Sequence, residues 1–352
     1  MKIAIVSGGT GGHIYPAMTL AEELEKRGHS VSFFGSNDRM EKDLIPESGF
    51  EYIGLDVYTT RGGIGQKLKS VVSIAKAYRQ CCSMLKGYDM AIGFGNYISI
   101  PVMLGASHLG LKTIIHEQNS FVGRANRVLD TKMDMVIGSY EENLKQFRNK
   151  NTFILGNPQV HKALNVKKDP QVIRDLGLDP DKKTVLIFMG SLGSASVNEK
   201  LLEYFALADG SYQIVYATGH YNYETVKKNA PDRDFIRYFE RVEGAKVMKN
   251  ADLLVSRAGA TTLAEICAIG APSILIPSPF VPNNHQFYNG KALVDKNAAE
   301  MIEEKDLDAV MLDKKINELV HDDKRLEVMS NNARKLANRN VLNDIIEKVE
   351  SL

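Results

Sequence analysis

The chain has 352 residues, of which 44% are hydrophobic and 25% charged, as in an ordinary globular protein with room for two domains. Its net charge of +1 gives no general electrostatic reason to expect a nucleic-acid partner. The sequence has no apolar run long enough for a membrane-spanning helix, and MKIAIVSGG is too short and glycine-rich for a signal peptide, so we expect a cytoplasmic protein. The three cysteines, two of them adjacent, predict neither a disulfide framework nor a metal site.

The first half begins with a short apolar strand, Lys2–Val6, followed by the glycine-rich turn SGGTGGH and a helix that ends near Gly28. Glycines let the backbone approach a ligand, and a helix N-terminus offers free N–H groups, so this turn is typical of a phosphate site. His13 lies beside it. Ile14 occupies the third glycine position of the dinucleotide fingerprint, and no acidic residue ends the second strand, which disfavours a nicotinamide dehydrogenase.

Strand and helix patterns then alternate, which predicts a doubly wound parallel sheet. The expected strands are Ser30–Phe34, Tyr52–Leu55, Met90–Ile92, Thr113–His116 and Met135–Ile137. Ligands of such sheets bind at the carboxyl ends of the strands. The turn at residues 93–97 and the sequence HEQN at residues 116–119 therefore belong to the same candidate site as His13.

The second half repeats this plan after a polar stretch, residues 159–183, that we expect to be a linker. A second glycine turn at residues 190–194 follows the first strand of this half. The turn Ser256–Gly259 precedes a helix that we expect to start near Ala260, with N–H groups and hydroxyls suited to a phosphate. Glu265 could accept hydrogen bonds from ribose hydroxyls. The expected strands are Thr184–Met189, Gln213–Ala217, Phe235–Tyr238, Leu253–Val255 and Ser273–Ile276.

The motifs GGTGGHIYP, HEQN with GRAN, GNP, SRAGATTLAE and NNHQFYN follow one another in the order seen in one family. Over nearly its whole length the chain resembles the MurG family, the GlcNAc transferases of peptidoglycan synthesis. The resemblance implies an α/β GT-B fold, in which two doubly wound Rossmann-like parallel-sheet domains face a central cleft. It implies an acceptor domain over residues 1–158, completed by a C-terminal helix at about 338–352, and a UDP-GlcNAc-binding domain over residues 159–337.

The activity implied by the resemblance is an inverting transfer of GlcNAc from UDP-GlcNAc to the C4 hydroxyl of MurNAc in undecaprenyl-diphospho-MurNAc-pentapeptide (lipid I). The product, lipid II, serves cell-wall biogenesis, cell shape and cell division. Two alternatives stay open: a related transferase with another lipid acceptor, of the diacylglycerol type, and an inert sugar-nucleotide-binding scaffold.

The resemblance also assigns roles to individual residues. The resemblance does not decide the general base. His13 is the first candidate, because an unperturbed pKa near 6.5 leaves it mostly neutral, and Glu117 is the second; binding of the diphosphate is the alternative role of His13. Donor-binding positions are Thr10, Gly11, Gly12, Asn119, Ser191, the backbone near Val242, Ala260, Thr261, Thr262, Leu263, Ala264, Glu265 and Gln286. Further positions used around the cleft are Tyr97, His116, Asn126 and Asn198.

Three positions depart from the family's pattern. Val160 stands where an arginine is common, Asn96 replaces a glycine of the second turn, and Met189 replaces a glycine of the third. The D-x-D strings, Asp179–Asp181 and Asp306–Asp308, do not follow strands of the candidate site. We therefore expect no cofactor and no protein-held metal, with helix dipoles and backbone N–H groups stabilising the leaving diphosphate instead.

Residues 57–88 contain six cations and no acidic residue, which is unusual in a nearly neutral chain. Anionic lipid headgroups attract such a segment, and apolar side chains among the cations can enter the headgroup layer. We expect peripheral binding to the cytoplasmic side of the plasma membrane, where other cell-wall synthesis proteins are expected partners. The residues expected to make this contact are Lys67, Lys69, Val72, Ala75, Lys76, Tyr78 and Arg79.

Overall fold

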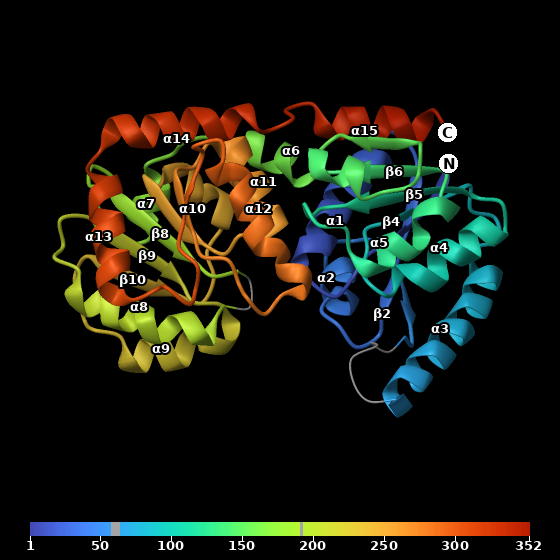
Figure 1. Ribbon diagram of the computed structural model, residues 1–352, viewed down its shortest axis with the longest axis horizontal. Helices are drawn as coiled ribbons and strands as arrows, with labels where there is room; N and C mark the ends of the chain where they lie inside the picture. Colours follow the sequence, from blue (N-terminus) through green and yellow to red (C-terminus); the bar gives the residue numbers. More distant parts are fainter. Residues whose placement is uncertain (58–63, 191–192) are drawn as a thin grey trace. The chain divides into compact units, whose positions relative to one another are not determined.

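The computed structural model describes the chain apart from residues 58–63 and 191–192, and leaves the side chains of residues 64–69 undescribed. The chain divides into two compact units (Figure 1). The N-terminal unit comprises Met1–His161 and Asn340–Leu352, and the C-terminal unit comprises Lys162–Arg339. These boundaries lie a few residues beyond those expected from the sequence.

The N-terminal unit contains a parallel sheet of order β3-β2-β1-β4-β5-β6-β7. Its strands are β1 (Lys2–Val6), β2 (Ser30–Ser36), β3 (Glu51–Leu55), β4 (Met90–Gly93), β5 (Lys112–Glu117), β6 (Met135–Gly138) and β7 (Thr152–Ile154). Its longer helices are α1 (Gly11–Lys26), α2 (Glu41–Glu47), α3 (Ile64–Met84), α4 (Ser99–His108), α5 (Arg124–Leu129) and α15 (Val341–Glu350). The predicted doubly wound sheet is confirmed, and β7 is an addition to it.

The centre of this sheet is apolar because helices cover both faces. Ile3, Ala4, Ile5 and Val6 of β1 are fully buried, which explains the unbroken apolar run of this strand. β1 pairs with β2 on one side and with β4 on the other. The strand order therefore reverses between β1 and β4. At such a switch point the turns that follow the two strands leave a crevice at the carboxyl edge of the sheet.

The C-terminal unit contains a second parallel sheet, of order β10-β9-β8-β11-β12-β13, whose switch point lies between β8 and β11. Its strands are β8 (Thr184–Phe188), β9 (Gln213–Ala217), β10 (Ile236–Phe239), β11 (Leu253–Ser256), β12 (Ser273–Leu275) and β13 (Glu300–Met301). Its helices include α7 (Gln171–Asp175), α8 (Ala195–Leu207), α9 (Tyr223–Asn229), α10 (Gly244–Asn250), α11 (Ala260–Ile269), α12 (His285–Val294), α13 (Ala309–Val320) and α14 (Asp323–Lys335). Figure 1 shows α8 and α13 beside this sheet.

The stretch 159–183, expected to be a polar linker, instead contains α6 (Gln159–Leu164) and α7. Its few apolar residues account for the difference, since Ala163, Ile173 and Leu178 are buried. A short helix can form in a polar stretch when one side packs on the core.

The C-terminal helix α15 belongs to the N-terminal unit and packs beside α1. Arg27 Nη2 donates a hydrogen bond of 2.8 Å to Asn343 Oδ1, and His29 Nε2 lies 3.1 Å from Glu350 Oε1. Lys348 Nζ lies 4.0 Å from the ring centroid of Phe153 in β7. The amphipathic pattern of the last residues thus serves to complete the first unit. No helix among the described residues is long and apolar enough to cross a membrane.

Candidate functional site

The first glycine turn places His13 at the switch point of the N-terminal unit. Thr10 is the N-cap of α1, and its Oγ1 lies 3.2 Å from His13 Nδ1. A Cβ atom built on Gly95, in the turn after β4, would lie 3.4 Å from His13 Nε2 and 3.6 Å from Asn126 Nδ2. The half-buried imidazole of His13 therefore lies against the second turn and close to Asn126.

Glu41, at the start of α2, supports this turn from beneath, a role that the sequence did not reveal. Its side chain is 1% exposed, and its Oε2 accepts a hydrogen bond of 3.0 Å from the N–H of Gly9. Its Oε1 accepts another, of 3.3 Å, from the N–H of Ser36. One N–H group that was expected to meet a ligand phosphate therefore meets a carboxylate of the protein.

Asn96, which replaces a family glycine, keeps the backbone conformation that a glycine would allow. Its φ of 68° is left-handed, a region that asparagine tolerates better than most residues. Its Nδ2 donates a hydrogen bond of 2.7 Å to the carbonyl of Gly8, and its Oδ1 accepts one of 2.6 Å from the N–H of Tyr97. Asn96 thus joins the two turns at the switch point. Gly9 cannot be replaced beside it, because a Cβ there would lie 1.9 Å from Asn96 Nδ2.

Glu117, at the end of β5, is 2% exposed and uses both carboxylate oxygens for hydrogen bonds inside the unit. Oε1 accepts from the N–H and the Nδ2 of Asn119, at 3.0 and 3.1 Å. Oε2 accepts from the N–H of Gly123 and from Asn126 Nδ2, both at 2.9 Å. Burial raises the pKa of Glu117, although these N–H donors oppose the shift. The carboxylate holds Asn119 and Asn126 in place.

His116 precedes Glu117 and is buried as a neutral imidazole. Its Nε2 lies 3.0 Å from the carbonyl of Gly156, and Gln118 Nε2 lies 3.1 Å from its Nδ1. Burial, with a smaller contribution from nearby His13, lowers the pKa of His116 to about 4, although the bond to Gly156 opposes this shift. The imidazole ring stacks on the ring of Phe94, with 5.1 Å between the ring centroids.

Asn126 and Tyr97 are two further predicted site residues of the N-terminal unit. Asn126 Nδ2 also donates a hydrogen bond of 3.0 Å to the carbonyl of His116. Its buried Oδ1 has no hydrogen-bond partner among the described residues. Tyr97 is half-buried, and burial together with the charge of Asp38 raises its pKa. The structure thus brings together His13, His116, Glu117, Asn119 and Asn126, whereas the Tyr97 side chain lies near Ser36, Asp38 and Arg39.

In the C-terminal unit Gly193, after β8, lies against the end of β9. Gly190 and Gly193 have φ values of 87° and 73°. A Cβ on Gly193 would lie 2.1 Å from the carbonyl oxygen of Thr218, so this position requires glycine. Ser191, a predicted diphosphate contact, lies outside the described residues. Asn198 of α8 is buried, and its Oδ1 accepts a hydrogen bond from the Tyr216 hydroxyl, so it faces the interior of the unit.

The helix α11 begins at Ala260, as predicted, directly after β11. Its N-cap is Gly259, which has no side chain that could occupy the N–H groups of the first turn. Thr261, Thr262, Ala264 and Glu265 of this helix are half-buried, whereas Ala260 and Leu263 are buried.

Two other predicted donor contacts lie on neighbouring loops of this unit. Val242 is half-buried in the loop between β10 and α10. Gln286, near the start of α12, accepts a hydrogen bond of 2.8 Å at its Oε1 from the N–H of Ser278. Ser278 follows β12, so this bond ties Gln286 to the carboxyl edge of the sheet.

Two departures from the family lie in the core. Val160 is 4% exposed and Met189 is 2% exposed, so neither side chain is presented to a ligand. The arginine that the family commonly has near Val160 therefore has no counterpart at that position.

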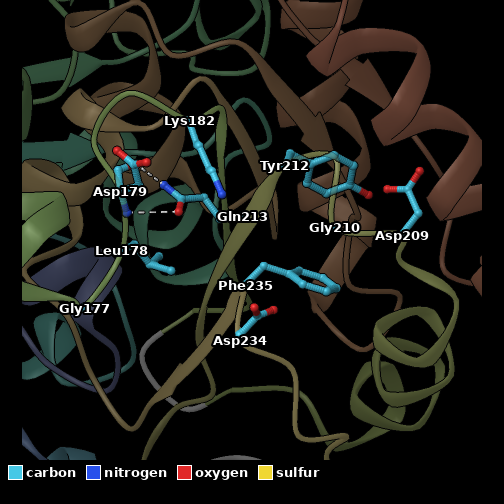
Figure 2. Close-up of a pocket in the computed structure, with 10 residues that line it drawn as sticks. All are labelled: Gly177, Leu178, Asp179, Lys182, Asp209, Gly210, Tyr212, Gln213, Asp234 and Phe235. Carbon is cyan, nitrogen blue, oxygen red and sulfur yellow. Dashed lines mark hydrogen bonds between the residues drawn. The ribbon is translucent and has the colours of Figure 1, made fainter.

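The D-x-D strings serve the protein structure. Asp308 caps α13 by accepting a hydrogen bond of 2.7 Å from the N–H of Met311. Asp179 lines a pocket of about 460 Å³ at the amino ends of β9 and β10, the edge opposite the candidate site, where Gln213 holds its backbone (Figure 2). Among the described residues, no three His, Cys, Asp or Glu side chains form a group that could hold a metal.

On α3 of the N-terminal unit, Ser73, Ala77 and Cys81 are buried, which leaves the opposite face exposed. Val72 is 61% exposed, and Ala75, Lys76 and Arg79 are also exposed, whereas Tyr78 is half-buried. Lys67 and Lys69 lie on the same helix, but their side chains are outside the description. A groove of about 640 Å³ beside this face is lined by Val71, Ile74, Ala75, Tyr78, Leu104, Ser107, His108 and Lys132.

Comparison with known proteins identifies the family. The model of the glycosyltransferase family 28 N-terminal domain matches residues 3–137, and that of its C-terminal domain matches residues 184–349. A UDP-N-acetylglucosamine–N-acetylmuramyl-(pentapeptide) pyrophosphoryl-undecaprenol N-acetylglucosamine transferase from Bacillus cytotoxicus is 36% identical over 100% of this chain and 99% of its own length. The protein of the same name from Halothermothrix orenii is 35% identical over 99% of this chain and 98% of its own length.

Solved structures agree with this assignment. MurG of Acinetobacter baumannii has a TM-score of 0.81 at 25% identity and covers 100% of this chain with 99% of its own. The glycosyltransferase of kitacinnamycin, at 17% identity, has a TM-score of 0.70 over 99% of this chain and 98% of its own, a likeness of fold alone. With full-length relatives at 35% and 36% identity and both domain models matched, the chain belongs to the MurG family within glycosyltransferase family 28.

Proposed function

We propose that this chain transfers GlcNAc from UDP-GlcNAc to the C4 hydroxyl of MurNAc in lipid I, with inversion, and so makes lipid II. The observation that carries the proposal is the grouping of His13, Asn119 and Asn126 around the switch point of the N-terminal unit, in a chain whose full-length relatives bear this activity in their names.

The reaction is a single displacement. The acceptor oxygen forms a bond to the anomeric carbon of GlcNAc, the bond from that carbon to the diphosphate breaks, and UDP leaves with the electron pair. The proton of the acceptor hydroxyl must pass to a base within hydrogen-bonding reach. We assign this base to His13, since Glu117 already accepts four hydrogen bonds and is better suited to positioning Asn119 and Asn126.

The C-terminal unit is proposed to bind the donor. The N-terminal turn of α11, with Thr261 and Thr262, would bind phosphate oxygens through N–H groups and hydroxyls. Glu265 would accept hydrogen bonds from the ribose, and Gln286 would contact the GlcNAc hydroxyls. The backbone near Val242 would contact the uracil, while Ser191 stays a predicted diphosphate contact. No protein-held metal is invoked, because Asp179 lies at the opposite edge of the sheet and Asp308 caps α13.

The acceptor is anchored in a membrane, so we also propose peripheral binding at the cytoplasmic face through α3. Val72, Ala75, Lys76 and Arg79 share an exposed face of this helix, and a groove lined largely by apolar side chains lies beside it. Cations attract anionic headgroups, and exposed valines can enter the interface. Other cell-wall synthesis proteins are the partners proposed at this surface.

The experiment that tests the function incubates the purified chain with lipid I and labelled UDP-GlcNAc and measures labelled lipid II. A diacylglycerol acceptor is assayed in parallel, and binding of UDP-GlcNAc is measured by calorimetry. Labelled lipid II supports the proposal. Transfer to diacylglycerol alone would indicate the alternative transferase, and donor binding without transfer to either acceptor would indicate a sugar-nucleotide-binding scaffold.

A further inference from the structure

Arg257, in the turn after β11, is 7% exposed and contacts three neighbouring segments of the C-terminal unit. Its Nη2 donates a hydrogen bond of 2.5 Å to Ser194 Oγ, the N-cap of α8, and its Nη1 donates one of 3.1 Å to the carbonyl of Ile276. The same Nη2 lies 2.6 Å from Glu304 Oε2. One guanidinium thus connects the segments that follow β8, β11, β12 and β13.

The partner of this arginine is equally buried. The side chains of Arg257 and Glu304 are 8% and 9% exposed. A charge held away from water requires compensation, and Glu304 supplies the opposite charge. The backbone of Glu304 is held in turn, because its carbonyl accepts a hydrogen bond of 2.9 Å from Lys200 Nζ of α8.

Three of the four segments that Arg257 joins lead to a proposed donor contact. Ser194 follows the glycine turn, Arg257 itself precedes α11, and Ile276 precedes Ser278, which binds Gln286. We infer that Arg257 and Glu304 form a positioning pair that sets the shape of the donor site without touching the donor. This inference rests on the proposed function, because it deepens the role given there to the C-terminal unit.

A competing role for Arg257 is direct binding of the diphosphate. The two roles make opposite predictions for Glu304→Gln, which keeps the side-chain shape and removes the charge. If the pair positions the loops, the uncompensated guanidinium disturbs them and the affinity for UDP falls. If Arg257 is a phosphate ligand, loss of its competing carboxylate leaves more positive charge for the phosphates and the affinity for UDP rises.

The test measures dissociation constants of uridine, UDP and UDP-GlcNAc by calorimetry, with kcat and KM for transfer to lipid I. We expect Glu304→Gln to weaken the binding of both uridine and UDP by about tenfold, which is the scale of one charge-assisted contact. KM for UDP-GlcNAc should rise with little change in kcat. Arg257→Lys should behave alike, because an ammonium cannot reproduce the planar fork. The matched control is Glu303→Gln, whose side chain is 41% exposed and forms an ion pair with exposed Lys305.

Ser194→Ala is a second test of the positioning role. It removes one contact of the pair and leaves Arg257 and Glu304 to compensate each other. This variant should also weaken the binding of UDP, and it tests the positioning role if Glu304→Gln does not fold. Tighter or unchanged UDP binding in the folded variants would overturn the positioning role while the proposed function stands. Failure of the parent chain to bind UDP would overturn the proposed function and this role together.

Discussion

At the switch point of the N-terminal unit the two turns are held by Asn96 and by the buried carboxylate of Glu41, whereas at that of the C-terminal unit they are held by the guanidinium of Arg257. Both units use the same strand–turn–helix plan, and both have glycines with positive φ in these turns. The supporting groups carry opposite charge. The resemblance between the halves therefore extends to the backbone and stops at the side chains.

This difference has a consequence for ligands. A carboxylate beneath the first glycine turn occupies the N–H of Gly9 and places negative charge where a phosphate would bind. In the C-terminal unit the N-cap of α11 is a glycine, and the nearby buried charge is a cation compensated by Glu304. The dipole of a helix N-terminus then favours an anion. The comparison favours the C-terminal unit for the donor diphosphate and the N-terminal unit for acid–base chemistry.

The largest predicted effect is on membrane binding, which we expect of a surface of the N-terminal unit and not of the C-terminal unit. Each cation near an anionic membrane contributes about 1 kcal/mol to binding. Losing four cations should therefore lower the affinity for the membrane by about a thousandfold. Replacing Lys67, Lys69, Lys76 and Arg79 by glutamate should abolish sedimentation with anionic liposomes and leave UDP-GlcNAc binding intact. The matched control makes the same charge change at exposed lysines of the C-terminal unit: Lys227, Lys228, Lys314 and Lys324. Equal sedimentation of the α3 variant and the parent would place the membrane surface elsewhere.

A second prediction uses the neutral burial of His116. Its pKa is about 4 in the folded chain and 6.5 when unfolded, so only the unfolded state takes up a proton between these values. The contribution of neutral His116 to the free energy of unfolding is fully present above pH 6.5. It decreases by about 3 kcal/mol as the pH falls from 6.5 to 4. In His116→Gln this part of the acid destabilisation should vanish. Urea unfolding of parent and variant at pH 7.5 and pH 5 measures this difference. An equal change in the free energy of unfolding for both proteins would contradict the prediction.

The chemistry assigned to the N-terminal unit is tested by His13→Ala. Loss of a general base lowers kcat by roughly two orders of magnitude or more. The dissociation constant of UDP-GlcNAc should change much less, because most of the proposed donor contacts lie in the other unit. If the loss appears mainly in donor affinity, His13 binds the diphosphate and Glu117 becomes the candidate base.

The donor assignment of the C-terminal unit is tested by Glu265→Ala. Losing charge-assisted hydrogen bonds to the ribose should weaken UDP-GlcNAc binding by roughly 1.5–3 kcal/mol while the fold is kept. The parent should also prefer UDP over 2′-deoxy-UDP, and the variant should lose that preference. Glu318→Ala, at a 49% exposed glutamate of α13, is the control. An unchanged dissociation constant by calorimetry would remove Glu265 from the ribose site.

Much of the fold could be predicted because parallel strands buried on both faces appear as short apolar runs. β7 and β13 were missed, since Thr152–Ile154 and Glu300–Met301 are too short, and only half-buried, to leave such a pattern.

The candidate site could be predicted where its residues are contiguous, as in HEQN at the end of β5. Contacts between distant segments could not, because no spacing rule connects Gly9 with Glu41, Gly8 with Asn96, or Arg257 with Glu304. These contacts depend on how the strands are ordered in the sheet, which the sequence pattern does not determine.

The smallest predicted effect isolates one such contact. Asn96→Gly restores the family residue and suits the left-handed backbone, but it removes the hydrogen bond from Nδ2 to the carbonyl of Gly8, together with the local one that Oδ1 accepts from the N–H of Tyr97. A bond of this kind contributes about 1 kcal/mol, which corresponds to about 2–4 °C in Tm for a unit of this size. Asn297→Gly is the matched control, because Asn297 has a φ of 52° and an exposed side chain. If both variants change Tm equally, the contact between the turns adds nothing; a larger loss for Asn96→Gly, with a lower kcat, would show that it helps to hold His13 in place.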